Sequence, residues 1–145
     1  MKKLEDIVDE WESDCEVNST QLDSESLRIP KLHAKYLRLL QIQKSRLPLV
    51  TNRYEKMKLL RWEYYNGKLS EEVLRQYKWD PFGLKVLKAD LHNYMSADEV
   101  LMPLKNKLDE CTETIGMLED ILKQISNRNF TIKNAIDFLR YTNGS

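Results

Sequence analysis

A regular spacing of apolar residues between Leu101 and Ile125 constrains the fold of this 145-residue chain more than any other feature. The intervals alternate between three and four residues, which is the heptad pattern of helices that associate along a narrow seam. Ser96 and Glu99, just before it, form the sequence signature of a helix capping box. We therefore predict a long helix with the seam residues Leu101, Leu104, Leu108, Cys111, Ile115, Leu118, Leu122 and Ile125.

The heptad pattern does not identify the partner of this seam. If the partner is a second subunit, the seam mediates oligomerisation; if the helix packs inside one subunit, the seam belongs to the core, and periodicity favours neither alternative. The long helix is expected to end at residues 127–129, which are Asn-Arg-Asn. A short final helix is then expected from Thr131, with apolar positions at helical spacing.

Helical periodicity also dominates the first half of the chain. Residues 3–13 predict a short amphipathic helix with a strongly acidic outer face. A second helix is expected to begin at Pro30, since proline is well tolerated in a first turn. Pro48 is expected to kink or interrupt it, because proline removes a backbone donor and clashes with the preceding turn. The helix then resumes and ends at Asn66–Gly67.

Residues 68–95 give weaker signals. Ser70 is expected to cap a short helix, and residues 80–83, Asp-Pro-Phe-Gly, to form a turn. Residues 84–95 are interpreted as a further helix. The sequence therefore predicts a mostly α fold.

Charge is strongly segregated along the chain, although the formal net charge is zero. Residues 1–27 contain nine acidic residues and two lysines, whereas residues 28–69 contain eleven basic residues and two glutamates. Such asymmetry indicates an acidic arm followed by a basic binding surface, and a polyanion becomes a plausible partner.

Signatures of catalysis are missing from the sequence. The four glycines never cluster, so there is no phosphate-binding loop or dinucleotide fingerprint. Neither histidine has a partner at metal-ligand spacing. We therefore expect no enzyme activity, no metal and no cofactor. No apolar run approaches the roughly 20 residues of a membrane span, and the first residues lack the apolar core of a signal peptide, so we expect a cytoplasmic protein without membrane contact.

The stretch RYEKMKLLRWEYYNGK, residues 53–68, combines cations and aromatic rings in one predicted helix. Single-stranded nucleic acid suits this mixture, because cations neutralise phosphates and aromatic faces stack on unpaired bases. The alternative is a core helix whose basic side chains extend past buried rings to water. The predicted single-stranded DNA (ssDNA) contacts are Arg53, Lys56, Lys58, Arg61, Tyr64, Tyr65 and Lys68.

The chain resembles the UvsY family of phage recombination mediators in five segments that occur in the family's order. They are KLEDIVDEW near the start, VNSTQLDSESLRIPKLHAKYL at 17–37, KLLRWEYYNGK at 58–68, LKADLHNYMSAD at 87–98 and RNFTIKNAIDFLRY at 128–141. The resemblance implies a mostly helical protein that binds ssDNA and loads the phage recombinase onto strands covered by single-strand-binding protein, in the host cell cytoplasm. It also assigns ssDNA contacts to Arg61 and Lys58.

The resemblance further implies a ring of six or seven subunits assembled through the C-terminal region. Residues 1–95 are then expected to hold the acidic helix and a kinked, basic and aromatic ssDNA-binding region, and residues 96–145 the oligomerisation helices. A different class of function stays open from the residues themselves, namely a coiled-coil scaffold or adaptor that binds only proteins.

Overall fold

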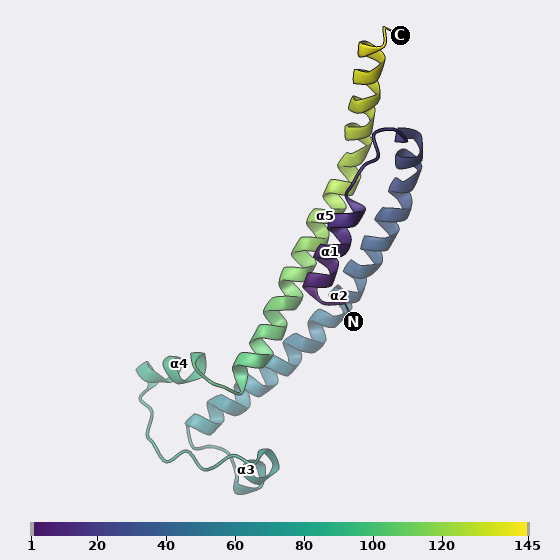
Figure 1. Ribbon diagram of the computed structural model, residues 1–145. Coiled ribbons are helices and arrows are strands. Elements are labelled where there is room, and N and C mark those ends of the chain that lie inside the picture. Colours follow the sequence, from purple (N-terminus) through teal and green to yellow (C-terminus); the bar gives the residue numbers. More distant parts are fainter. Residues whose placement is uncertain (1, 145) are drawn as a thin grey trace. The chain divides into compact units, whose positions relative to one another are not determined.

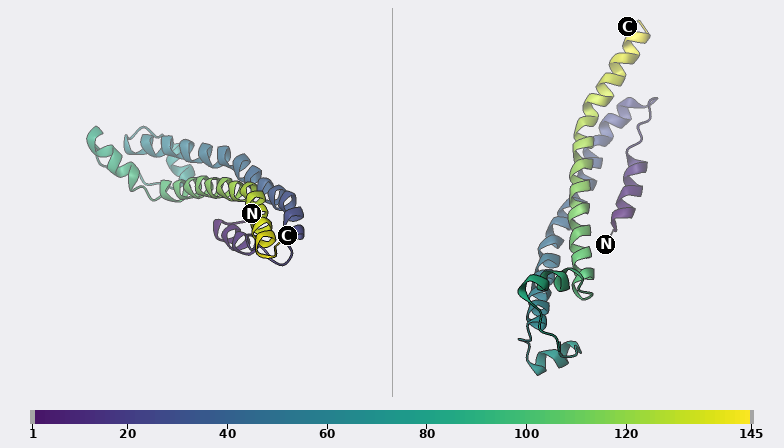
Figure 2. Two further views of the ribbon diagram at one scale, coloured as in Figure 1. Left: turned by 90° about the horizontal axis from the view of Figure 1, so that it is seen from above. Right: turned by 90° about the vertical axis from the view of Figure 1, so that its left-hand side faces the viewer.

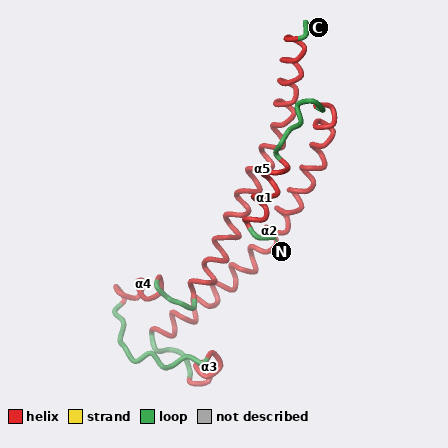
Figure 3. Tube along the Cα trace, viewed as in Figure 1, coloured by secondary structure: helices red, strands yellow, loops and turns green. Residues whose placement is uncertain are grey.

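The computed structural model describes residues 2–144, which form five helices and no strand (Figures 1 and 3). The mostly α fold predicted from periodicity is confirmed. The helices are α1 (Leu4–Asp14), α2 (Leu22–Tyr65), α3 (Glu71–Tyr77), α4 (Lys88–Ser96) and α5 (Leu101–Thr142).

Helix α2 is longer than the sequence predicts and contains both prolines in its interior. It begins at Leu22, eight residues before Pro30, and the interruption that we considered at Pro48 is absent. Buried Leu40 and Val50 lie on either side of Pro48. Packing on both sides holds the helix together, because tertiary contacts stabilise helices more than local propensity does. The predicted end is confirmed, since Gly67 has a φ of 67° directly after the helix.

Helix α5 also differs from the prediction at both ends. It runs without a break through residues 127–129, so the separate final helix does not exist. Arg128 explains this continuity, because its side chain is buried and donates a hydrogen bond to the Cys15 carbonyl at 2.8 Å. At the start, Ser96 is the last residue of α4, and Asp98 caps α5 instead by accepting from the Leu101 amide at 3.0 Å.

The helices between residues 68 and 98 follow the sequence prediction closely. Ser70 Oγ accepts a hydrogen bond from the Val73 amide and caps α3 as expected. Residues 80–83 are irregular instead of forming the predicted turn, and a bend follows at Leu84. This segment has no regular ladder of backbone hydrogen bonds to fix its shape, so its position depends on side-chain packing.

The chain forms two compact units, Met1–Ser45 with Thr112–Ser145 and Arg46–Cys111. Helices α2 and α5 each contribute to both of them. The functional division at residue 95 that the sequence suggested stays a prediction, because it concerns roles and not packing.

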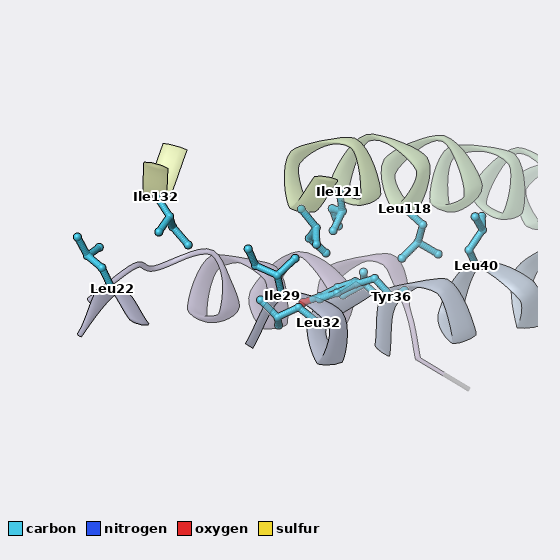
Figure 4. Packing of buried hydrophobic residues seen from close by; sticks show 10 residues of the cluster. Leu22, Ile29, Leu32, Tyr36, Leu40, Leu118, Ile121 and Ile132 are labelled. Carbon is cyan, nitrogen blue, oxygen red and sulfur yellow. The ribbon is translucent and has the colours of Figure 1, made fainter. Parts of the chain in front are cut away.

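The first unit is built around apolar residues of α1, α2 and α5. Figure 4 shows side chains of α2, among them Tyr36, directed toward Leu118 and Ile121 of α5. Helix α1 packs against the same cluster through Ile7 (Figures 1 and 2). The cluster consists of Ile7, Leu22, Ile29, Leu32, Tyr36, Leu40, Leu118, Ile121, Ile125 and Ile132.

Polar contacts fix the end of α1 onto this unit. The Tyr36 hydroxyl donates to Asp14 Oδ2 at 2.8 Å, and Lys35 Nζ lies 2.5 Å from the same oxygen. Arg28 of α2 donates to the Asp14 carbonyl at 3.1 Å, which satisfies an orphan acceptor of the helix end. The acidic arm expected from the charge pattern is therefore partly neutralised inside the subunit.

The predicted seam residues largely pack within one chain. Leu118 and Ile125 are fully buried in the first unit, and Leu101 and Cys111 are buried in the second. A side chain buried in its own chain is not available to a second copy, so for these four the structure favours the intrasubunit alternative. The other four, Leu104, Leu108, Ile115 and Leu122, are half-buried, and an intersubunit role for them stays a prediction.

Candidate nucleic-acid interface

The basic and aromatic stretch lies in the second unit, on the last turns of α2 and just beyond them. Arg53, Lys56 and Lys58 have exposed side chains, and Lys68 is exposed after the helix end. Four of the seven predicted ssDNA contacts therefore present cations to solvent, where phosphates could reach them.

Arg61 differs from these four cations, because only 9% of its surface is exposed. Its Nε donates to Asp98 Oδ2 at 2.7 Å, and its guanidinium carbon lies 4.4 Å from the ring centre of Tyr64 and 4.6 Å from that of Trp79. A planar guanidinium is well suited to such combined pairing and stacking. The geometry gives Arg61 a structural partner, so it does not belong to the exposed cationic surface.

The two tyrosines also face inward. The Tyr65 hydroxyl donates to Asp98 Oδ2 at 2.5 Å, and only 9% of the residue is exposed. Tyr64 is half-buried and donates to the Asp80 carbonyl at 2.5 Å. Both rings contact Phe82, with centroid distances of 5.7 Å for Tyr64 and 5.0 Å for Tyr65. For these two rings the structure favours the core alternative over base stacking.

Asp98 organises this cluster, and sequence reasoning gave its side chain no role, although it lies within the predicted capping box at 96–99. One carboxylate oxygen binds Arg61 and Tyr65, while the other accepts from the amides of Val100 and Leu101 at 2.8 and 3.0 Å. Its position three residues before the start of α5 is the available sequence signal. Burial alone would raise the pKa of Asp98, but the hydrogen bonds from Tyr65 and Arg61 outweigh it and hold that pKa below its ordinary value.

The pKa of Arg61 shifts in the opposite direction to that of Asp98. Burial alone would lower the pKa of the Arg61 guanidinium, but the hydrogen bonds to Asp98 and Tyr65 raise it above its ordinary value. Both partners are therefore ionised at neutral pH, and the pair links α2 to the start of α5.

Trp62 is the exposed ring of the stretch, and sequence reasoning missed it. Its exposed fraction is 38%, and Lys68 Nζ lies 4.6 Å from its ring centre. Leu59, one turn earlier, is 58% exposed. The helical wheel gave little signal, because Trp62 lies three residues before buried Tyr65 and therefore at the border of the buried face. An exposed indole beside a cation is suited to stacking on an unpaired base.

A cavity of about 240 Å³ lies in the same unit and is lined by α2, α4 and α5. Lys58 and Tyr54 line it from α2, and Lys58 Nζ lies 5.8 Å from the Tyr54 ring centre. The other polar lining residues are His92, Ser96 and Lys105. Its walls thus combine cations, an aromatic ring and neutral polar groups.

The described residues, 2–144, hold neither a metal site nor a membrane span. No group of His, Cys, Asp and Glu side chains within this range is arranged to hold a metal ion. No helix within it is long and apolar enough to cross a membrane.

Comparison with known proteins identifies relatives over almost the whole chain. The family model described as "Recombination, repair and ssDNA binding protein UvsY" matches residues 10–145. No curated protein sequence matches significantly. Two crystal structures of the bacteriophage T4 recombination mediator protein UvsY share the fold, each with a TM-score of 0.84. In lattice type IV the identity is 21%, over 97% of this chain and 99% of that one; in lattice type II it is 22%, over the whole of both chains.

Proposed function

The chain belongs to the UvsY family, and from this membership we propose that it is a recombination mediator that binds ssDNA without catalysing a reaction. The observation that carries the proposal is the set of exposed cations Arg53, Lys56, Lys58 and Lys68, which share the last turns of α2 and the residues just after it with exposed Trp62. We name this group the cationic face. Lysine and arginine neutralise phosphates without reading sequence, as a mediator that acts on any strand requires.

Each cationic face is small, so one subunit binds ssDNA weakly and several subunits act together. A ring of six or seven copies raises the effective concentration of the later contacts, and apparent affinity rises by roughly 10²–10⁴ without a new kind of contact. The strand held in this way is bent into a form that the recombinase accepts.

The end of α5 supports assembly better than the buried seam does. Phe130, Phe138 and Tyr141 are 68%, 65% and 84% exposed and lie on one side of the helix. The last turns of α5, yellow in Figure 1, extend past the connection between α1 and α2. A monomer rarely exposes so many large apolar side chains in succession, so we assign this apolar end of α5 to contact between subunits.

Mediation also requires contacts with the recombinase and with single-strand-binding protein. The outer face of α1 is a candidate surface, since Glu5, Asp6, Asp9 and Glu12 are exposed there. Glu10 and Asp14 are held by Lys35 and are less available.

The experiment is a binding titration with fluorescent oligonucleotides, single- and double-stranded, at two salt concentrations. We expect preferential binding of single strands that weakens with salt, together with faster assembly of the recombinase on strands precoated with single-strand-binding protein. A chain that binds neither strand but still binds the two proteins would instead be an adaptor.

A further inference from the structure

The cavity beside the cationic face has features that the proposed function does not yet use. Exposed Lys58 on α2 and exposed Lys105 on α5 both line it, so two cations come from different helices. No carboxylate is among the side chains that line it. A cavity with cations and no acid favours an anionic ligand.

The remaining walls suit a flat, partly apolar group. Tyr54 contributes a half-buried ring, and Met95 and Met102 contribute polarizable thioethers that adapt to irregular shapes. His92 and Ser96 lie on α4, with His92 Nε2 at 3.4 Å from Ser96 Oγ. This pair supplies both a donor and an acceptor, which the edge of a nucleobase needs.

We propose that this cavity receives one unstacked nucleotide of the bound strand. Lys58 and Lys105 contact the phosphates on either side of it, the base lies against Tyr54 and the methionines, and His92 with Ser96 faces its polar edge. The inference rests on the proposed ssDNA binding and deepens it, because it extends the interface from α2 to α4 and α5. Double-stranded DNA is disfavoured, since a paired and stacked base cannot enter without losing its partner.

The Arg61–Asp98 pair acquires a second role in this arrangement. Asp98 caps α5 four residues before Met102 and is held by Arg61 of α2. Arg61 thus sets the distance between the two helices that carry Lys58 and Lys105. It is a positioning residue, which acts on the cavity without touching the strand.

The test compares Lys105→Ala with Lys107→Ala. Both remove one exposed lysine from the same stretch of α5, but only Lys105 lines the cavity. Affinity for a fluorescent oligothymidine is measured by anisotropy at several salt concentrations, with melting curves as a check on folding. We expect Lys105→Ala to weaken binding about 5-fold and to reduce the log–log salt slope by roughly 0.7, whereas Lys107→Ala leaves both unchanged. If Lys105→Ala melts early, Lys105→Gln takes its place.

A second experiment tests whether a nucleobase is bound in the cavity. An oligonucleotide with scattered abasic residues should bind the unaltered protein about 10-fold more weakly than oligothymidine, and Tyr54→Leu should reduce this difference. If the Lys105 and Lys107 variants bind equally well, and the abasic oligonucleotide binds as tightly as oligothymidine, the cavity does not receive a nucleotide. The proposed ssDNA binding would not be affected by that result. An unaltered protein that fails to bind oligothymidine would overturn the proposed function itself, so the two failures are distinguishable.

Discussion

Arg61 Nε lies 2.7 Å from Asp98 Oδ2, and this ion pair joins two residues that are 37 positions apart in the chain. The Tyr65 hydroxyl donates to the same oxygen, so the carboxylate is shared by two side chains from successive turns of α2. The arginine that most resembles a DNA contact in the sequence is therefore part of the framework that carries the cationic face.

Replacing Arg61 by Ala should destabilise the protein, because it leaves the buried Asp98 carboxylate without its cation. Breaking a buried pair in this way costs roughly 3–5 kcal/mol of unfolding free energy. Urea unfolding followed by circular dichroism measures the loss. Lys56→Ala is the matched control, since that side chain is exposed and its removal should leave the unfolding midpoint within error. An unchanged midpoint for Arg61→Ala would contradict the structural role.

Acid should weaken the same cluster. The folded-state pKa of Asp98 is lowered, so its contribution to stability is complete above the unfolded-state value of about 3.9 and is lost as pH falls through the lower folded-state pKa. Unfolding free energies at pH 7 and near pH 3 should therefore differ more for the unaltered protein than for Asp98→Asn. The comparison with this variant also removes the shared contributions of Glu10 and Asp14, whose pKa values are lowered as well. Parallel pH profiles would show that Asp98 is not the responsible group.

Trp62 and Tyr65 should respond oppositely to substitution. Trp62→Ala should cost roughly 1–3 kcal/mol of ssDNA binding while the melting temperature stays nearly constant, because the ring is exposed and free to stack on a base. Tyr65→Phe should lower the melting temperature, because it removes the hydroxyl bound to Asp98, and should change binding little. Measuring both quantities on both variants decides the roles. If the Trp62→Ala protein keeps its full affinity for ssDNA, Trp62 does not stack on a base.

Charge placed on the apolar end of α5 should break the assembly. The double variant Phe138→Asp, Tyr141→Asp should sediment as a monomer or small oligomer and retain its helical signal, because neither side chain packs in the core. Its affinity should fall more for long oligonucleotides than for short ones, since avidity is lost. Asn129→Asp, which also adds one charge to an exposed position of α5 but lies away from the side that carries Phe130, Phe138 and Tyr141, serves as the control and should assemble normally. A double variant that sediments like the unaltered protein would place the subunit contact elsewhere.

The helices could be predicted from the sequence because periodicity and caps are local, whereas the roles of individual side chains depended on distant partners. Helix α3 with its Ser70 cap and the heptad pattern of α5 were readable directly. The continuity of α2 through Pro48 could not be predicted, because packing overrides the local cost of proline. The burial of Arg61 could not be predicted either, because its partner Asp98 comes from a segment whose position no local sequence pattern fixes.

The salt dependence of ssDNA binding by two variants tests the central claim that exposed cations, and not the buried arginine, contact the strand. The triple variant Arg53→Ala, Lys56→Ala, Lys58→Ala should melt like the unaltered protein but lose roughly 2 units of log–log salt slope, at about 0.7 per lost contact. Arg61→Lys, measured below its own melting transition, should keep the slope of the unaltered protein. A triple variant with full slope and affinity, alongside a reduced slope for Arg61→Lys, would contradict the account.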